Sequence, residues 1–144
     1  MKDKARIIEN VKTLKDFIGN RQLNVMTSLL RGEEGEHFEN KLEEYATRVT
    51  EMPATYGTEG TEIPEKIVHL HYFYNNMDWY IVEKDMGDES DDTTQYQAFG
   101  IADIGFGLSG LGYISIDEIT GLGAELDLYW TPKTVKEVHE LRGE

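Results

Sequence analysis

Hydrophobic and polar residues change their spacing near residue 66 of this 144-residue chain. Before that point apolar residues recur every three or four positions, as on one face of a helix, and after it they mostly alternate, as on strands. We therefore predict an α+β fold, in which N-terminal helices pack on an antiparallel β-sheet of four to five strands, with a C-terminal helix. We expect one domain, 1–144, with a helical part (1–53), a sheet part (66–130) and the C-terminal helix (131–141).

Three helices are predicted in the helical part. Residues 4–18 and 36–52 each carry an apolar stripe, and residues 22–30 form a shorter segment of the same kind. Pro53 ends the third helix, because proline cannot continue the hydrogen-bond ladder. Residues 54–64 are polar and contain glycine, which predicts a loop.

The stretch from Lys66 to Asp85 is the expected centre of the sheet. Two runs rich in β-branched and aromatic residues flank the polar corner 75–78, which is the pattern of a β-hairpin. Alternation places Trp79 and Ile81 on one face. Both faces of the hairpin carry bulky side chains, so we expect helices to cover it.

Further strands are predicted at 96–103, 111–116 and 124–130, where apolar residues alternate with polar ones or glycine. Thr131 and Pro132 are predicted to begin the C-terminal helix, with threonine as N-cap and proline at the first helical position.

The segment 105–110, GFGLSG, matches the motif G-x-G-x-x-G. That motif binds a pyrophosphate where it follows a parallel strand and opens a helix. Here it leads into the β-like run 111–116 in anionic surroundings, so we reject a dinucleotide site and expect the glycines to permit tight turns. Ser115 and Glu118 then match a capping box at a short turn.

Charge is distributed unevenly along the chain, whose formal net charge is −14. Residues 59–130 contain 15 carboxylates and only two lysines, whereas residues 1–21 carry six cations and three anions. Because the acidic half repels phosphate, we expect no direct nucleic-acid binding. Its charge serves either solubility or attraction to a protein with a basic surface. The basic helix 4–18 fits a membrane surface or a partner groove, but a helix that covers the core is the simpler interpretation.

The chain contains no cysteine, which excludes disulfides, thiolate zinc sites and cysteine catalysis. It has no apolar N-terminal segment of signal-peptide type and no run of 18 apolar residues. We therefore expect a cytoplasmic protein that neither is secreted through a signal peptide nor spans a membrane. The oligomeric state is left open.

Carboxylates crowd the end of the hairpin and the last strand. The candidate acidic interaction surface consists of Asp85, Asp88, Glu89, Asp91, Asp92, Glu125 and Asp127. The cluster at 88–92 lacks the ligand pattern of an EF-hand, so we expect a solvated hairpin tip and not a calcium site. The last two of these acids share a strand face and could serve acid–base chemistry, but no nucleophile or anion-binding motif accompanies them.

His69 and His71 form an H-x-H pair whose imidazoles could reach one metal ion, with Glu83, His37 or His139 as a third ligand. Histidines in so aromatic a strand also pack and form hydrogen bonds without a metal. With only two adjacent ligands and no thiolate, we expect no metal and no cofactor.

An ordered series of motifs runs through most of the chain, from about residue 36 to residue 138. Its clearest members are His71-Tyr72-Phe73, Asp78-Trp79-Tyr80-Ile81, Gln97-Ala98-Phe99-Gly100, Leu111-Gly112-Tyr113-Ile114-Ser115 and Asp127-Leu128-Tyr129-Trp130-Thr131-Pro132-Lys133. In this series the chain resembles an uncharacterised bacterial family, domain of unknown function 2958. Its relatives look like accessory proteins of plasmids, phages and conjugative elements, so the resemblance implies a mobile-element setting. It supplies no catalytic residues.

Three functions remain open at this point. The first is a non-enzymatic module that binds a protein with a basic surface, such as a nuclease or DNA-binding protein, and so acts as a DNA mimic against restriction or CRISPR machinery. The second is a structural accessory domain in plasmid transfer or replication. The third is a metal-dependent enzyme that uses His69 and His71. We expect the first.

Overall fold

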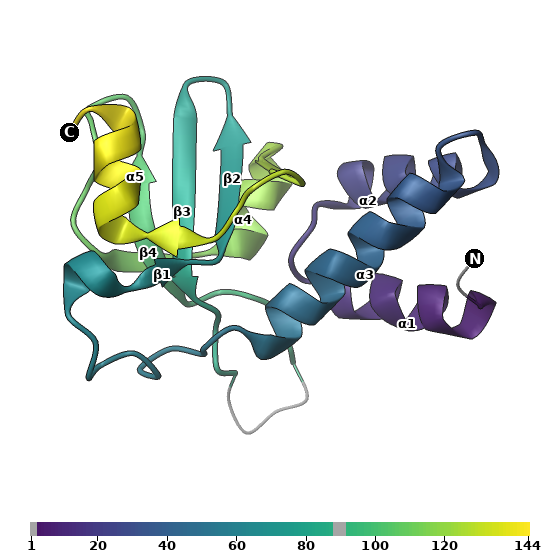
Figure 1. The fold of residues 1–144 in the computed structure, drawn as a ribbon, viewed down its shortest axis with the longest axis horizontal. Helices are drawn as coiled ribbons and strands as arrows, with labels where there is room; N and C mark the ends of the chain where they lie inside the picture. The colour runs from purple at the N-terminus through teal and green to yellow at the C-terminus, as the bar shows by residue number, and fades with distance from the viewer. Residues whose placement is uncertain (1–2, 88–91) are drawn as a thin grey trace.

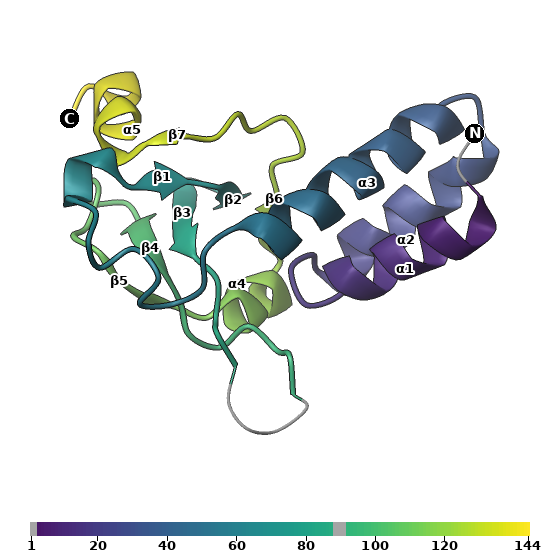
Figure 2. The same cartoon turned by 60° about the horizontal axis from the view of Figure 1, so that its bottom comes forward.

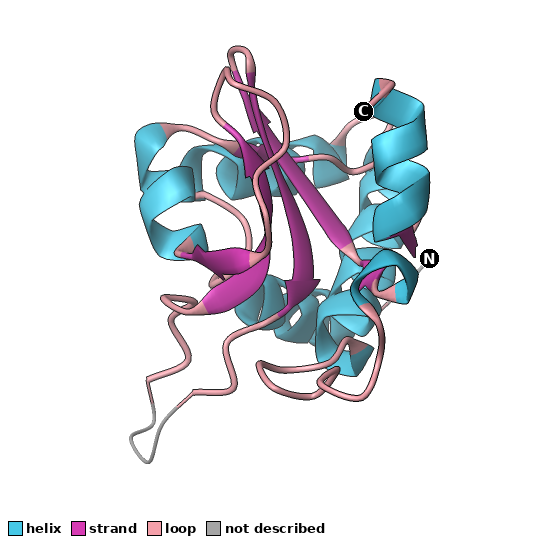
Figure 3. Cartoon of the chain, turned by 90° about the vertical axis from the view of Figure 1, so that its left-hand side faces the viewer, coloured by secondary structure: helices cyan, strands magenta, loops and turns pink. Residues whose placement is uncertain are grey.

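The computed structural model describes residues 3–87 and 92–144, and it places helices on both sides of an antiparallel sheet (Figures 1 and 3). The N-terminal helices gather on one side and α5 lies on the other (Figure 2). The helices are α1 (Lys4–Leu14), α2 (Asn20–Ser28), α3 (Gly35–Glu51), α4 (Ile116–Leu122) and α5 (Val135–Arg142), with the short 3-10 helices η1 (Leu29–Arg31) and η2 (Ile63–Glu65). The predicted α+β class is confirmed. Among the described residues, no helix combines the length and apolar character needed to cross a membrane.

The main sheet has five antiparallel strands in the order β5-β4-β3-β2-β6. These strands are β2 (Leu70–Tyr74), β3 (Met77–Glu83), β4 (Ala98–Asp103), β5 (Gly112–Ile114) and β6 (Glu125–Leu126). The β2–β3 hairpin forms the centre, as predicted, and it turns at Asn75, which has a φ of +52°. Asparagine tolerates this left-handed conformation better than most residues. A separate two-stranded ladder joins β1 (Ile67–Val68) to β7 (Lys133–Thr134).

Each face of the hairpin is buried in its own hydrophobic cluster. Trp79 and Ile81 pack with residues of α1, α2, α3 and α4, among them Leu42. Tyr80 and Val82, on the other face, pack with residues of α5 and the segment before it. Alternation along β3 therefore explains why the hairpin carries bulky side chains at consecutive positions.

Polar side chains fasten the N-terminal helices to the chain around β6. The amide of Gln22 donates to the carbonyl of Leu126 and accepts from its N–H, each at 2.8 Å. On α3, the Tyr45 hydroxyl donates to the carbonyl of Asp127 at 2.7 Å, and Arg48 Nη1 donates to the carbonyl of Trp130 at 3.0 Å. The segment 126–130 is thus held by helices that precede it by about 80 to 100 residues.

The predicted strand 124–130 is shorter in the structure, where only Glu125–Leu126 pairs with β2. The side chain of Asp127 explains its early end, because Asp127 Oδ1 accepts from the N–H of Tyr129 at 2.9 Å. This local bond, characteristic of aspartate, turns the backbone away from the sheet.

The C-terminal helix begins at Val135, and the prediction that it begins at Thr131-Pro132 is wrong. Thr134 is the N-cap, and a reciprocal capping box with Glu137 fixes the start of the helix. The two residues before the helix are extended because they pair with β1. A threonine is the N-cap, as predicted, but it is Thr134 and not Thr131.

Other boundaries also differ from the predictions. α1 ends at Leu14, before the predicted end at residue 18, and Gly19 is the N-cap of α2. The first predicted strand of the hairpin is interrupted after Val68. Val68 packs in the hydrophobic cluster with α5, whereas Leu70 packs in the cluster with the N-terminal helices. β1 leaves the main sheet to pair with β7, so the regular alternation that linked His69 to His71 is interrupted.

Candidate functional site

The α5-facing side of the sheet carries a polar cluster, the His71 cluster, which consists of His71, Asp78, Asp103, Asp127 and Arg142. His71 Nδ1 lies 2.9 Å from Asp127 Oδ2, and its Nε2 lies 2.7 Å from Asp78 Oδ1. Both ring nitrogens therefore face a carboxylate, an arrangement that an imidazole carrying two N–H groups satisfies completely.

Aromatic rings enclose His71, whose side chain is only 13% exposed. Tyr80, its cross-strand partner on β3, stacks on the imidazole with ring centroids 4.8 Å apart. Trp130 packs against the same ring at 5.1 Å, and its indole N–H donates to the carbonyl of Val68 at 3.0 Å. These contacts fix the imidazole between its two carboxylates.

Arg142, the last residue of α5, joins the helix to the sheet. Asp78 and Asp103 are direct cross-strand neighbours on β3 and β4, and two like charges in that position repel each other. Arg142 Nη1 donates to Asp78 Oδ2 at 3.2 Å and to the Tyr80 hydroxyl at 3.1 Å, and its Nη2 donates to Asp103. The guanidinium thus bonds both carboxylates and reduces their mutual repulsion.

The shifted pKa values agree with a cluster whose ionised groups are hydrogen-bonded to one another and to the backbone. Hydrogen bonding from the backbone of Gly105, with a further contribution from Arg142, lowers the pKa of Asp103 although burial opposes this. Burial disfavours the charged form of Arg142, but hydrogen bonds with Tyr80 and Glu144 outweigh it, so its pKa is raised. Burial also raises the pKa of the Tyr80 phenol. Asp103 and Arg142 are therefore a stable ion pair near neutral pH.

The structure brings His71 together with Asp78 and Asp127, not with the histidines or the glutamate considered as metal ligands. His37 Nε2 lies 3.1 Å from the Tyr129 hydroxyl, and Glu83 accepts from backbone N–H groups elsewhere. Within residues 3–87 and 92–144, no group of three histidine or carboxylate side chains is arranged to hold a metal ion. His69 is half-buried, and burial together with the charge of Arg48 lowers its pKa.

The acidic residues selected from the sequence do not all act as free surface charges. Asp85 accepts from the N–H groups of Gly87, Tyr96 and Gln97, so it holds together the two ends of the segment after β3. Asp127 is engaged by His71. Asp92 and Glu125 are exposed, while Asp88, Glu89 and Asp91 lie outside the described residues.

These residues also occupy different parts of the molecule. Asp85 and Asp92 line a groove with residues of α1 and the end of α3, whereas Glu125 lines another groove beside the β2–β3 turn. The described members therefore do not form one continuous patch.

Both lysines of the acidic half direct their ammonium groups inward. Lys66 is 7% exposed, and its Nζ donates to the carbonyl and hydroxyl oxygens of Thr58. Lys84 Nζ donates to the carbonyls of Val49 and Thr50 at the end of α3, at 2.6 and 3.1 Å. A cation at a helix C-terminus satisfies free carbonyls and complements the helix dipole.

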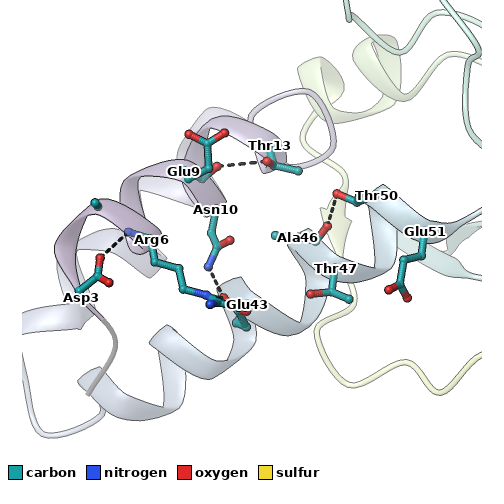
Figure 4. Close-up of a pocket in the computed structure, with 11 residues that line it drawn as sticks. Asp3, Arg6, Glu9, Asn10, Thr13, Glu43, Ala46, Thr47, Thr50 and Glu51 are labelled. Carbon is teal, nitrogen blue, oxygen red and sulfur yellow. Dashed lines mark hydrogen bonds and ion pairs between the residues drawn. The ribbon is translucent and has the colours of Figure 1, made fainter.

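A groove of about 690 Å³ runs between α1 and α3 (Figure 4). Arg6 and Asn10 of α1 reach across it to Glu43 of α3, with Asn10 Nδ2 donating to Glu43 Oε2 at 2.7 Å. The Arg6 guanidinium and the Asn10 amide thus bind the Glu43 carboxylate across the groove, and these contacts hold the two helices together.

A smaller cavity of about 290 Å³, the Tyr56 pocket, lies between the loop after α3 and the strands β4 and β5, of which β5 is at the edge of the main sheet. Tyr56, Phe99 and Tyr113 form its aromatic lining, and Glu83 and Lys66 line it as well. Glu83 is buried, with Oε1 accepting from the N–H of Tyr56 at 3.0 Å and Oε2 from groups of Thr58.

The glycine-rich loop after β4 has no free set of amides for a phosphate. Asp103 Oδ1 accepts from the N–H groups of Gly105 and Gly107, and Glu144 accepts from the N–H of Leu108. The two glycines have φ values of +111° and +90°, which explains their use in this tight turn. The loop continues into β5 and not into a helix.

The sequence analysis missed Asp78, Asp103 and Arg142 as members of the His71 cluster. One signal for Arg142 was present, since it is the first arginine after Arg48. Asp78 and Asp103 stand at hairpin and strand ends, where acidic residues are common, so only the register of β3 against β4 reveals that they meet.

A family model described as a protein of unknown function (DUF2958) matches residues 40–133. No curated protein and no solved structure matches the chain. The matched range contains the hairpin, both edges of the main sheet and four members of the His71 cluster, and lacks Arg142. The resemblance inferred from the motifs is confirmed, while its mobile-element association stays a prediction. The chain belongs to this family of proteins of unknown function, DUF2958.

Proposed function

We propose that this chain is a non-enzymatic protein-binding module whose acidic surface engages a partner with a basic, nucleic-acid-binding surface. In a mobile genetic element, such a module acts as a DNA mimic that inhibits a restriction or CRISPR nuclease of the host. Two features support this function: the acidic charge of the sheet half and the mobile-element setting that the family resemblance implies.

The observation that carries the proposal is the inward orientation of Lys66 and Lys84. They are the only lysines or arginines among residues 59–130, which contain 15 carboxylates. Both ammonium groups donate to oxygen atoms of the chain itself, and Lys66 is buried, so the 15 carboxylates of this half are accompanied by only one partly exposed cation, Lys84. A protein that needs charge only for solubility does not need to separate its carboxylates from its lysines in this way, because a surface with mixed charges is equally soluble.

The loop between α3 and β1 supplies a defined part of this surface, which we call the acidic loop (residues 54–65). Glu59, Glu62 and Glu65 are exposed on it, beside the exposed side chains of Tyr56 and Ile63. η2, which ends the loop, packs against α5 (Figure 1). Carboxylates next to apolar anchors suit a protein interface, in which charge steers the encounter and apolar groups slow dissociation.

The His71 cluster supports a binding role over a catalytic one. Its carboxylates and its guanidinium are bound to one another, and the imidazole is covered by Tyr80 and Trp130. A general acid or base needs hydrogen-bond access to a substrate proton. We therefore assign the cluster a structural role, which is to hold α5 and the segment after β6 against the sheet.

The test is inhibition of DNA cleavage by a panel of purified restriction and CRISPR nucleases. We expect the wild-type chain to inhibit at least one nuclease, to compete with its DNA and to bind no DNA itself. The variant Glu59→Gln/Glu62→Gln/Glu65→Gln should inhibit more weakly, because long-range attraction falls with each neutralised carboxylate.

The matched control is Glu33→Gln/Glu34→Gln/Glu36→Gln, which removes the same charge from exposed glutamates around the start of α3. It should inhibit like the wild-type chain. If both triple variants inhibited the nuclease equally weakly, inhibition would depend on net charge alone, and the acidic loop would be excluded as the contact. Absence of inhibition across the panel would reject the mimic and favour the accessory-domain function.

A further inference from the structure

The Tyr56 pocket has three aromatic walls that belong to two separate parts of the chain. Phe99 and Tyr113 are cross-strand partners on β4 and β5, and their rings meet edge to face with centroids 5.6 Å apart. Tyr56 comes from the acidic loop, and its hydroxyl lies 2.6 Å from that of Tyr113. Both tyrosines are 56% exposed, so a ligand can reach the rings from solvent.

The backbone of Tyr56 is unusual, because its φ of +72° lies in the left-handed region. A bulky non-glycine residue pays a conformational cost there, and surrounding contacts must offset it. Glu83 supplies such contacts, since its carboxylate accepts from the N–H groups of Tyr56 and Thr58. A buried carboxylate thus holds an exposed aromatic ring at the mouth of the pocket.

The charges inside the pocket neutralise each other. Lys66 donates to the hydroxyl oxygen of Thr58 at 2.6 Å, and that hydroxyl donates to Glu83. The ammonium and the carboxylate are therefore linked through Thr58. Glu59 also lines the pocket, and its side chain is exposed. The charge that remains for a ligand is thus negative.

We propose that the Tyr56 pocket binds the guanidinium of an arginine side chain presented by a partner protein. A guanidinium is planar, stacks on aromatic rings and forms two parallel hydrogen bonds with a carboxylate, so Tyr113 and Glu59 supply complementary groups. An anionic ligand would meet Glu59, and a wholly apolar ligand would leave that carboxylate unused. This assignment rests on the proposed function for its partner, and it makes arginine the anchor of the interface.

The direct test uses N-acetyl-L-arginine amide as the probe and the intact, isotope-labelled chain, with binding followed by NMR. We expect saturable shifts at Tyr56, Phe99 and Tyr113. The citrulline analogue, which has the same shape without the charge, should bind at least about fivefold more weakly, the effect of losing roughly 1 kcal/mol of cation–aromatic attraction.

Variants separate the contributions of charge and ring. Glu59→Gln should weaken arginine binding by about fivefold, as expected for loss of one charge-assisted contact. Glu62→Gln changes the same charge at a position that does not line the pocket, and should retain the wild-type affinity. Tyr113→Leu should abolish the shifts, whereas Tyr113→Phe, which keeps the ring, should restore them.

These experiments test arginine binding by the pocket separately from the proposed DNA-mimic function. No saturable shift with the arginine probe, or equal binding of the citrulline analogue, would overturn the pocket assignment even if a nuclease is inhibited. Arginine binding that Tyr113→Leu removes would support the pocket even if the nuclease panel shows no inhibition, and the DNA-mimic function alone would then be rejected.

Discussion

Arg142 is the side chain on which the charge balance of the His71 cluster depends. It compensates Asp78 and Asp103, whose side chains are 24% and 8% exposed. We expect Arg142→Met to lower the free energy of unfolding by about 2–3 kcal/mol, because it leaves two adjacent, partly buried carboxylates without a cation. Urea denaturation at neutral pH measures this.

Lys136→Met is the control for that variant, since it removes an exposed cation from the same helix. It should change the stability by less than about 0.5 kcal/mol, the usual range for surface substitutions. Adding Asp103→Asn to Arg142→Met should recover part of the loss, because one of the two repelling charges is then gone. No difference between the two single variants would mean that Arg142 does not stabilise the cluster.

His69 gives the molecule a defined pH dependence. Burial, together with the charge of Arg48, lowers its pKa in the folded state below the ordinary value of 6.5. As the pH falls below 6.5, the unfolded chain takes up a proton at this position before the folded chain does, so the folded state loses stability down to the lower, folded-state pKa.

We expect His69→Gln to lose less stability than the wild-type chain between pH 7.5 and pH 5.5 (about one unit on either side of the ordinary histidine pKa). The comparison at the higher pH controls for any direct effect of the substitution on packing. Denaturation midpoints at both pH values provide the measurement. Identical losses in the two proteins would show that His69 titrates alike in the folded and unfolded chains.

At the scale of elements, the β2–β3 hairpin is the centre of the fold. Trp79 is 6% exposed and packs in the cluster shared with the N-terminal helices. Trp79→Ala should cost about 3–5 kcal/mol, because the cavity left by a buried aromatic ring cannot collapse fully. Phe106→Ala is the control, since that ring is 91% exposed. An unchanged denaturation midpoint for Trp79→Ala would contradict the central position of the hairpin.

The start of α5 gives a matched pair of threonine variants. Thr134→Ala removes the N-cap that bonds the N–H of Glu137 at 3.0 Å, and should cost about 1 kcal/mol of stability. Thr131→Ala alters the threonine that the sequence favoured as N-cap, and should cost little, because that residue is exposed and precedes the helix. Chemical denaturation compares the two variants, and the reverse order of stability would place the helix start at Pro132.

Periodicity predicted the elements that bury a regular stripe or alternate over several residues. α3 and the hairpin satisfy this condition, so their positions agree closely with the predictions. The end of β6 and the start of α5 depend on single side-chain bonds, made by Asp127 and Thr134. Several residues in the chain could form such bonds, and the sequence alone does not select among them.

The candidate site was less predictable than the fold, for a related reason. His71 and Asp127 are separate candidates in the sequence, 56 positions apart, and only the pairing of β6 with β2 brings them together. The aromatic walls of the Tyr56 pocket likewise come from positions 56, 99 and 113, and no local pattern links these. A site whose residues come from different strands can be recognised only when the register of those strands is known.

At the scale of the whole molecule, charge is segregated along the chain. The first 21 residues carry a formal excess of cations, whereas the lysines of the sheet half are bound internally. We expect the resulting field to attract a basic partner and to repel nucleic acid. This segregation is the central claim, because both the proposed function and the arginine pocket depend on it.

The most direct test is the salt dependence of binding to a nuclease that the chain inhibits. The Debye length falls from about 10 Å at 0.1 M salt to about 3 Å at 1 M, so attraction between exposed charges weakens steeply over this range. We expect the Kd to rise steeply with salt, the acidic-loop variant Glu59→Gln/Glu62→Gln/Glu65→Gln to show a shallower rise, and DNA to displace the chain. A Kd that is independent of salt, or equal slopes for the wild-type and variant chains, would contradict the account.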